Sequence, residues 1–238
     1  IRMYAGRYGD VTYDSSLVNK ELLRDLYKTY GIRVIMGNFL GAYCVGSGAT
    51  WDQGTDYTDP KQRECMKSIV RAMVMDLKDE PFVLMWVLGN ENNMVSVSAE
   101  VNASRTNAGQ HPQVWAEFLN EVATMIHEID PKHPVAVGNL ENGMADVYAQ
   151  YAPAIDVFGI NSYRGQYGFG SLWVDTKRLF DRPILITEYG CDAFSFQLNA
   201  PDEEAQARSL EASVRDMTFN QAGGPYAGNC IGGVLFEY

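Results

Sequence analysis

The sequence predicts an α/β fold in which helices cover a parallel β-sheet. Short runs of β-branched and aromatic residues alternate with longer segments in which apolar residues recur at helical spacing. The chain has 238 residues, 46% of them hydrophobic, and α/β barrels commonly reach this length as one domain. Neither a fixed-period repeat nor a low-complexity linker divides it. We therefore expect a single domain spanning residues 1–238.

Seven segments are expected to be strands, because each is a short apolar run bounded by polar or turn-forming residues. In chain order they are Ile1–Tyr4, Ile32–Met36, Phe82–Leu88, Pro134–Gly138, Val157–Asn161, Ile184–Glu188 and Ile231–Phe236. A (β/α)8 TIM barrel closes with eight strands. The count of seven therefore predicts a trimmed barrel that lacks the first βα unit, together with the last helix.

The segments between the expected strands carry apolar stripes typical of helices packed on a core. One helix is expected to begin at Asp59 and Pro60, since proline fits the first turn. Its stripe consists of Met66, Ile69, Val70, Met73, Val74 and Leu77. A second helix is expected from Pro112, with a stripe of Trp115, Phe118, Leu119, Val122, Met125, Ile126 and Ile129. We interpret both stripes as core packing.

The charge balance argues against several classes of partner. Nineteen Lys and Arg stand against 30 Asp and Glu, a formal charge of -11, so we expect no nucleic acid partner. No apolar run approaches the roughly 20 residues that span a bilayer, so no membrane span is expected. Residues Ile1–Tyr4 carry no signal-peptide pattern. The location in the cell stays open, with a secreted or periplasmic protein slightly favoured.

The spacing of potential metal ligands predicts no metal site. The histidines at 111, 127 and 133 have no ligand spacing. Cys44, Cys65, Cys191 and Cys230 form no C-x-x-C pair, so free thiols are the plain interpretation. We expect neither a metal nor an organic cofactor.

Two carboxylates stand where expected strands leave the core. The segment Phe82–Leu88 is followed by Gly89, Asn90 and Glu91, and Glu188 ends a second buried segment. The carboxyl ends of parallel strands line the mouth of a barrel, so both glutamates are expected to face one opening. Cleavage of a glycosidic bond needs such a pair: one carboxyl protonates the leaving oxygen, and the other attacks the anomeric carbon. Either glutamate alone is equally well explained as an ion-pair partner or helix cap.

The flanking residues resemble those of retaining β-glycosidases with (β/α)8 barrels, and the catalytic domain of glycoside hydrolase family 2 is the nearest pattern. The motifs are Gly89-Asn90-Glu91 and Thr187-Glu188-Tyr189-Gly190, with further likeness in Ile1–Tyr4, Tyr30–Ile35, Ile129–Pro134 and Asp156–Tyr163. A second similarity, to fungal β-1,3-glucanosyltransferases, rests on Thr187–Cys191 and Gly232–Tyr238.

The resemblance implies a retaining double displacement with Glu91 as acid/base and Glu188 as nucleophile. It also implies that Asn90 bonds the sugar 2-hydroxyl, and that Arg2 and Tyr163 orient Glu188. A nearby guanidinium keeps a nucleophile ionised, whereas an acid needs a raised pKa. Plainer interpretations stay open: an ordinary salt bridge for Arg2, and packing at the rim for Tyr163.

Aromatic side chains in the expected mouth loops are suited to stacking on sugar rings. We predict that Trp51, in the segment 41–59, and Trp173, in the segment after the fifth strand, bind a carbohydrate substrate. Packing of the loops onto the barrel is the alternative. Family 2 enzymes usually show Trp after the last strand, where this chain has Glu237 and Tyr238, so a sugar platform there is left open.

The sequence therefore predicts a retaining β-glycoside hydrolase that acts on a β-linked oligo- or polysaccharide. A β-glucan transglycosidase, in which a sugar replaces water as the acceptor, is the alternative within enzymes. A catalytically silent carbohydrate-binding barrel is the alternative outside them. A phosphate-binding metabolic barrel is the least favoured function, because the chain is acidic and lacks a Gly-rich phosphate loop near its last strands.

Overall fold

Across residues 1–94 and 102–236, which the computed structural model describes, seven parallel strands form one curled sheet. The strands, in sheet order, are β1 (Arg2–Tyr4), β2 (Val34–Asn38), β3 (Val83–Leu88), β4 (Val135–Leu140), β5 (Val157–Asn161), β6 (Ile184–Tyr189) and β9 (Cys230–Leu235). Every neighbouring pair is parallel. The predicted α/β class and all seven predicted strands are confirmed.

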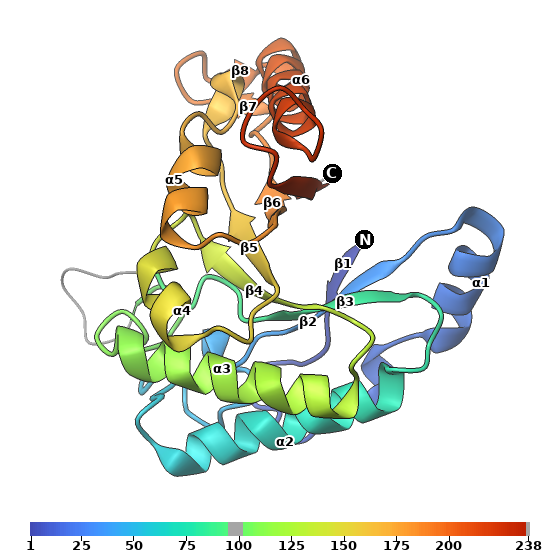
Figure 1. Ribbon diagram of the computed structural model, residues 1–238, viewed down its shortest axis with the longest axis vertical. Helices are drawn as coiled ribbons and strands as arrows, with labels where there is room; N and C mark the ends of the chain where they lie inside the picture. The colour runs from blue at the N-terminus through green and yellow to red at the C-terminus, as the bar shows by residue number, and fades with distance from the viewer. Residues whose placement is uncertain (95–101, 237–238) are drawn as a thin grey trace.

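Helices connect the strands on the outside of the curl (Figure 1). The α-helices are α1 (Lys20–Tyr30), α2 (Pro60–Leu77), α3 (Pro112–Ile129), α4 (Ala145–Tyr151), α5 (Leu172–Leu179) and α6 (Glu203–Asn220). Short 3-10 helices lie at η1 (Ser15–Leu17), η2 (Ala42–Cys44) and η3 (Gly165–Tyr167), and an antiparallel hairpin pairs β7 (Phe194–Ser195) with β8 (Ala200–Pro201). No helix in the described ranges is long and apolar enough to cross a membrane.

The two apolar stripes pack as the sequence predicts. In α2 the Asp59 carboxylate caps the helix by accepting from the Lys61 N–H, and Pro60 occupies the first turn. All six stripe residues of α2 are buried, as are Trp115, Phe118 and most of the stripe of α3. Figure 1 shows α2 and α3 lying side by side against the sheet.

Local signals explain where β2 begins. Gly31 adopts a left-handed conformation (φ 69°) at the end of α1, which is favourable for glycine. The Ile32 N–H still bonds to the Leu26 carbonyl (3.4 Å), so Ile32 closes the helix. The strand therefore begins at Val34 instead of Ile32.

The sheet does not close on itself within the described residues. Strand β1 pairs with β2, and β9 pairs with β6, so these two strands are the edges of the sheet. Figure 1 shows the blue β1 and the dark red β9 at opposite ends of the curl. The described sheet is thus open and curled, with seven strands.

The strands present alternate residues to two cores, as the period of a strand requires. The larger core lies between the sheet and the helices and includes Met36, Trp86 and Phe158. A smaller cluster faces the other side of the sheet and consists of Ile35, Met85, Val87, Ala136, Val157 and Leu185. All seven strands run in the same direction, so their carboxyl ends lie at one end of the sheet. The residues that follow the strands therefore lie together at that end.

Candidate active site

Five of the sequence-predicted residues meet at the carboxyl ends of the strands. Arg2 lies in β1, Asn90 and Glu91 follow β3, Tyr163 follows β5, and Glu188 lies in β6. Hydrogen bonds join them into one network. The pair Arg2 and Glu188 is separated by 186 positions in the chain, so the fold alone assembles this site.

Glu188 is held at both of its carboxylate oxygens. The Arg2 Nη1 atom donates to Oε1 (2.8 Å), and the Tyr163 hydroxyl donates to Oε2 (2.9 Å). The Arg2 side chain is only 5% exposed, so its charge acts through little intervening solvent. Burial and the bond to Glu188 raise the pKa of Tyr163 above its ordinary value, so its hydroxyl stays a donor.

Glu91 has a different environment from Glu188. Its backbone is left-handed (φ 56°), an uncommon conformation outside glycine, and its N–H donates to the Gly138 carbonyl (2.8 Å). Burial raises the pKa of the Glu91 carboxyl, and the nearby Glu188 charge adds to this increase. A bond from Asn161 and the charge of Arg2 oppose the increase without cancelling it. Glu91 therefore retains a proton to higher pH than an ordinary glutamate.

Asn161, at the end of β5, links the two glutamates and was not among the predicted site residues. It is fully buried, and its Nδ2 donates to Glu91 Oε1 (3.0 Å). Its Oδ1 accepts from Arg2 Nη1 (3.1 Å) and Thr187 Oγ1 (2.7 Å). A guanidinium can only donate, so the atom facing Arg2 is the oxygen and the N–H faces Glu91. When Glu91 is protonated, its Oε1 is thus occupied as an acceptor and the proton lies on Oε2.

The orientation of the Asn90 amide also follows from its contact with Arg2, which can only donate. Its Oδ1 accepts from Arg2 Nη2 (2.9 Å), from Asn161 Nδ2 (3.1 Å) and from the Tyr4 hydroxyl (3.3 Å). Its Nδ2 is therefore turned the other way, toward the Tyr43 hydroxyl (3.3 Å). The amide N–H groups are the part of Asn90 that is available to a ligand hydroxyl.

Some of the additional residues carried a usable sequence signal. Asn161 and Thr187 are polar residues at the ends of buried strands, the same signal that indicated Glu91 and Glu188. Tyr43 is an aromatic residue of the expected mouth segment 41–59, but its contact with Asn90 depends on a left-handed loop conformation (φ 55°).

The two predicted tryptophans lie apart from this network. Trp173 is 1% exposed, packs edge-on against Phe169, and donates its indole N–H to Asp216 (3.1 Å). A side chain enclosed in this way cannot stack on a sugar, so the structure corrects the prediction for Trp173. Trp51 is 45% exposed and packs edge-on against Tyr8, and its contact with substrate stays a prediction. The positions 237 and 238 lie outside the described residues.

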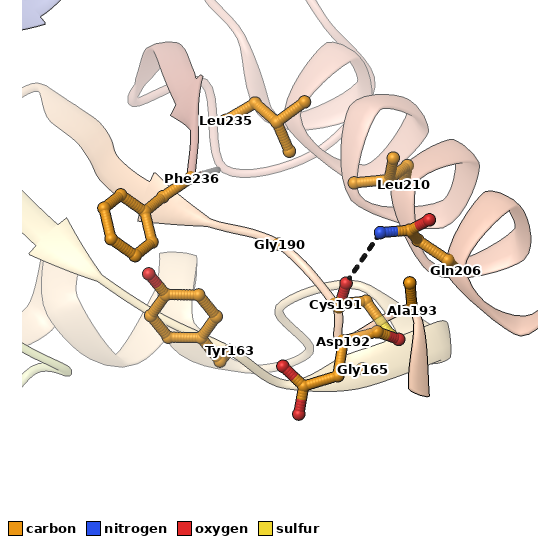
Figure 2. Close-up of a pocket in the computed structure, with 10 residues that line it drawn as sticks. All are labelled: Tyr163, Gly165, Gly190, Cys191, Asp192, Ala193, Gln206, Leu210, Leu235 and Phe236. Carbon is orange, nitrogen blue, oxygen red and sulfur yellow. Dashed lines mark hydrogen bonds between the residues drawn. The ribbon is translucent and has the colours of Figure 1, made fainter. Parts of the chain in front are cut away.

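A pocket of about 880 Å³ adjoins the site at Tyr163. It lies between the segment after β6, the end of β9 and helix α6 (Figure 2). Its lining residues are Tyr163, Gly165, Gly190, Cys191, Asp192, Ala193, Gln206, Leu210, Leu235 and Phe236. Figure 2 shows the Tyr163 hydroxyl directed toward the Phe236 ring at one end. The volume falls within the range of about 300–1,000 Å³ that is typical of small-molecule sites.

Metal ligands are not gathered in the part of the chain that the structure describes. There, no three His, Cys, Asp or Glu side chains are grouped so that they could hold a metal ion. The four cysteines are free thiols, and those of Cys44 and Cys230 are buried.

A family model described as "Glycosyl hydrolases family 2, TIM barrel domain" matches residues 15–205. This span includes Asn90, Glu91, Tyr163 and Glu188. The chain belongs to this family. The parallel direction of the seven strands agrees with a TIM barrel domain.

Individual relatives of this family 2 domain include several glycosidases. A probable mannan endo-1,4-β-mannosidase C of Aspergillus terreus is 30% identical over 82 residues, which are 34% of this chain and 20% of that protein. A β-D-glucuronidase of Dictyoglomus thermophilum has a similar fold (20% identity, TM-score 0.61, 100% of this chain and 38% of that chain). An exo-β-1,4-mannosidase from Opitutaceae bacterium strain TAV5 has a similar fold as well (20% identity, TM-score 0.65, 99% of this chain and 45% of that chain).

A β-galacturonidase of Eisenbergiella tayi also has a similar fold (18% identity, TM-score 0.60, 92% of this chain and 35% of that chain). At these identities the solved structures show a common fold. The chain spans less than half the length of each of these four relatives.

Proposed function

We propose that this family 2 domain is the catalytic barrel of a retaining β-glycosidase, with Glu188 as nucleophile and Glu91 as acid/base. The unequal environment of the two carboxyls is the observation that carries the proposal. Both oxygens of Glu188 accept hydrogen bonds, one of them from the Arg2 guanidinium, while burial raises the pKa of Glu91. A carboxyl with a raised pKa suits the acid, and a carboxylate held in place at both of its oxygens suits the nucleophile.

In the first step the Glu188 carboxylate forms a bond to the anomeric carbon as the glycosidic C–O bond breaks. Arg2 and Tyr163 hold the carboxylate in position for this attack. Glu91 transfers the proton on its Oε2 to the leaving oxygen, because Oε1 already accepts from Asn161. The products of this step are the free leaving group and a glycosyl ester of Glu188.

In the second step Glu91, now a carboxylate, removes a proton from water while the water oxygen attacks the anomeric carbon. The bond to Glu188 breaks, and Glu91 is protonated again. Two successive inversions give net retention. If a sugar hydroxyl replaces water, the same step produces a transglycosylation product.

The relatives support a β-glycoside as substrate and leave the sugar open. The names of these enzymes refer to glucuronides, galacturonides, mannosides and mannan, so we propose a β-linked oligo- or polysaccharide. We also propose that a further strand between the free edges of β1 and β9 completes an eight-stranded barrel. The two unpaired edges of the described sheet and the family match support this.

The test is hydrolysis of aryl β-glycosides and β-linked oligosaccharides by the chain and by two matched variants, Glu188→Gln and Glu91→Gln. We expect the chain to release product whose anomeric configuration, followed by NMR, is initially retained. Glu188→Gln should be inactive on all substrates. Glu91→Gln should lose less activity on substrates whose leaving group needs no proton, such as dinitrophenolate.

Azide separates the two roles further. Glu91→Ala should be rescued by azide to give a β-glycosyl azide, and Glu188→Ala should give an α-glycosyl azide, because azide then attacks from the opposite face. Inverted product from the unaltered chain contradicts the proposal. Sugar binding by a folded protein without turnover, unchanged in Glu91→Gln, indicates the carbohydrate-binding barrel instead.

A further inference from the structure

Glu141 is a further acidic residue at the carboxyl ends of the strands, directly after β4. Its backbone is left-handed (φ 48°), an uncommon conformation outside glycine. Its N–H donates to the carbonyl of Asn161 (3.1 Å), the residue that ends β5. Glu141 is therefore fixed beside the segment that follows β5, in which Tyr163 lies.

Both chain neighbours of Tyr163 bind the Glu141 carboxylate. The Ser162 hydroxyl donates to Glu141 Oε1 (2.7 Å). Arg164 donates to Glu141 Oε2 through Nε (3.0 Å) and Nη2 (2.5 Å). The Tyr163 hydroxyl donates instead to Glu188 Oε2 (2.9 Å). The contacts thus alternate along the chain, as they do where successive side chains point to opposite sides.

The same segment is anchored at two further points. The Ser162 N–H donates to the Glu188 carbonyl (2.9 Å), and Ser162 is buried. Arg164 Nη1 donates to the Phe169 carbonyl (2.6 Å), and the Phe169 N–H donates to the Asp216 carboxylate in α6 (2.7 Å). Arg164 therefore closes the turn that follows Tyr163, and Glu141 holds the residue at which that turn begins.

The exposure of these side chains separates positioning from stability. The side chains of Arg164 and Glu141 are 31% and 34% exposed. Ion pairs that are exposed to this extent contribute little to stability, because solvent screens the charges. Tyr163 is itself 47% exposed, so surrounding packing restricts its side chain only in part. The main consequence of the Glu141 contacts is the place that they give to the Tyr163 hydroxyl.

We propose that Glu141 is a positioning residue that acts through Tyr163. By binding Ser162 and Arg164, it keeps the Tyr163 hydroxyl within hydrogen-bond distance of the Glu188 carboxylate. Its effect on turnover rests on the proposed glycosidase function, in which Glu188 is the nucleophile. The contact between Tyr163 and Glu188 can be observed without turnover.

A double-mutant cycle tests whether Glu141 acts through Tyr163, with kcat and KM measured on an aryl β-glycoside. Tyr163→Phe removes a hydrogen bond to a charged group and should lower kcat/KM roughly 10- to 150-fold. Glu141→Ala should lower kcat on the order of 10-fold with little change in KM, because it displaces a group that holds the nucleophile. In the Tyr163→Phe background the same change should cost less than about 3-fold. Equal losses in the two backgrounds overturn the inference.

Two other variants separate positioning from a general loss of an ion pair. Glu141→Gln keeps one acceptor oxygen and should retain more activity than Glu141→Ala. Glu80→Ala is the matched control, because Glu80 accepts from Arg24 Nε (2.7 Å) and Nη2 (2.5 Å) in the segment before β3, at the other end of that strand from Glu91.

The melting temperatures and the activities of these variants are compared together. Glu141→Ala and Glu80→Ala should have similar melting temperatures, while only Glu141→Ala should lose turnover. Should Glu141→Ala melt below the assay temperature, Glu141→Gln replaces it in the cycle with Tyr163→Phe. A Glu141→Ala variant as active as Glu80→Ala contradicts the inference.

A spectroscopic readout distinguishes failure of this inference from failure of the proposed function. The chain is labelled with 3-fluorotyrosine, and the resonance missing from Tyr163→Phe is that of residue 163. We expect Glu141→Ala to shift this fluorine resonance toward that of a free tyrosine, and Glu80→Ala to leave it in place. If the folded chain cleaves no glycoside while the resonance responds in this way, the glycosidase proposal fails and the positioning by Glu141 stands. A resonance that Glu141→Ala leaves in place overturns the inference, whatever the activity.

Discussion

Replacement of Asn161 by aspartate tests how Glu91 is held. Aspartate has the same shape and keeps an oxygen for the bonds from Arg2 (3.1 Å) and Thr187 (2.7 Å). It removes the N–H that Glu91 Oε1 accepts at 3.0 Å and adds a negative charge beside Glu91. Loss of a hydrogen bond to a charged group costs about 1.5–3 kcal/mol, which corresponds to roughly a 10- to 150-fold decrease in kcat/KM.

The pH dependence of Asn161→Asp has a definite sign. The bond from Asn161 favours the ionised form of Glu91 and lowers its pKa, so its removal raises that pKa. A second carboxylate at residue 161 raises it further. Glu91 must be protonated in the first step, so the alkaline limb of the kcat/KM profile should move to higher pH in the variant.

The assay is kcat/KM for an aryl β-glycoside measured from pH 4 to 10, with circular dichroism to confirm folding. Thr187→Val is the matched control, because it removes one bond to Asn161 while Arg2 still fixes the amide. The control should lose only a few-fold activity and keep the wild-type alkaline limb. An alkaline limb that stays in place, or moves to lower pH, in Asn161→Asp refutes the assignment of Asn161 as the residue that positions Glu91.

Three further predictions concern the charges and the tryptophans. Arg2→Ala leaves Glu188 without its buried partner, so it should lower the free energy of unfolding, measured by urea denaturation, by about 3–5 kcal/mol. It should also abolish turnover in kinetic assays, and unchanged stability contradicts the prediction. Glu91→Gln should raise the melting temperature at pH 7. The pKa of Glu91 is raised in the folded protein, so ionisation of Glu91 at neutral pH destabilises the fold and the glutamine avoids this cost. Below about pH 4 the carboxyl is protonated in both the folded and unfolded states, and the difference in melting temperature should disappear. Trp173→Ala should lower the free energy of unfolding by about 3–5 kcal/mol. Trp51→Ala should leave the melting temperature unchanged and raise KM for oligosaccharides. A stable Trp173→Ala beside a destabilised Trp51→Ala contradicts the burial of Trp173.

The sequence predicts the strands and the two glutamates because their signals are local. A buried run such as Val83–Leu88 is recognisable from its own composition, and a carboxylate that ends it is conspicuous. The common direction of the strands then places Glu91 and Glu188 at one end of the sheet without further information. Family resemblance supplied the roles of Arg2 and Tyr163, whose bonds to Glu188 the structure contains.

The missed features depend on three-dimensional packing. Asn161 is a polar residue at the end of a buried strand, but its place in the site follows a register shift between β5 and β6, and its role depends on the donor-only character of Arg2. The prediction for Trp173 was wrong for a related reason. Whether this side chain is exposed depends on which face of α5 packs against the core. That face places the indole against Phe169 and Asp216.

The position of Arg2 on an edge strand connects the chemistry to local opening of the sheet. Strand β1 has three residues and pairs with β2 on one side, so its amides should exchange with solvent sooner than those of the central strands. Each opening of β1 withdraws the guanidinium from Glu188. The fraction of time for which β1 is paired therefore sets an upper limit on the fraction of molecules ready to react, and whatever secures that edge increases turnover without touching the substrate.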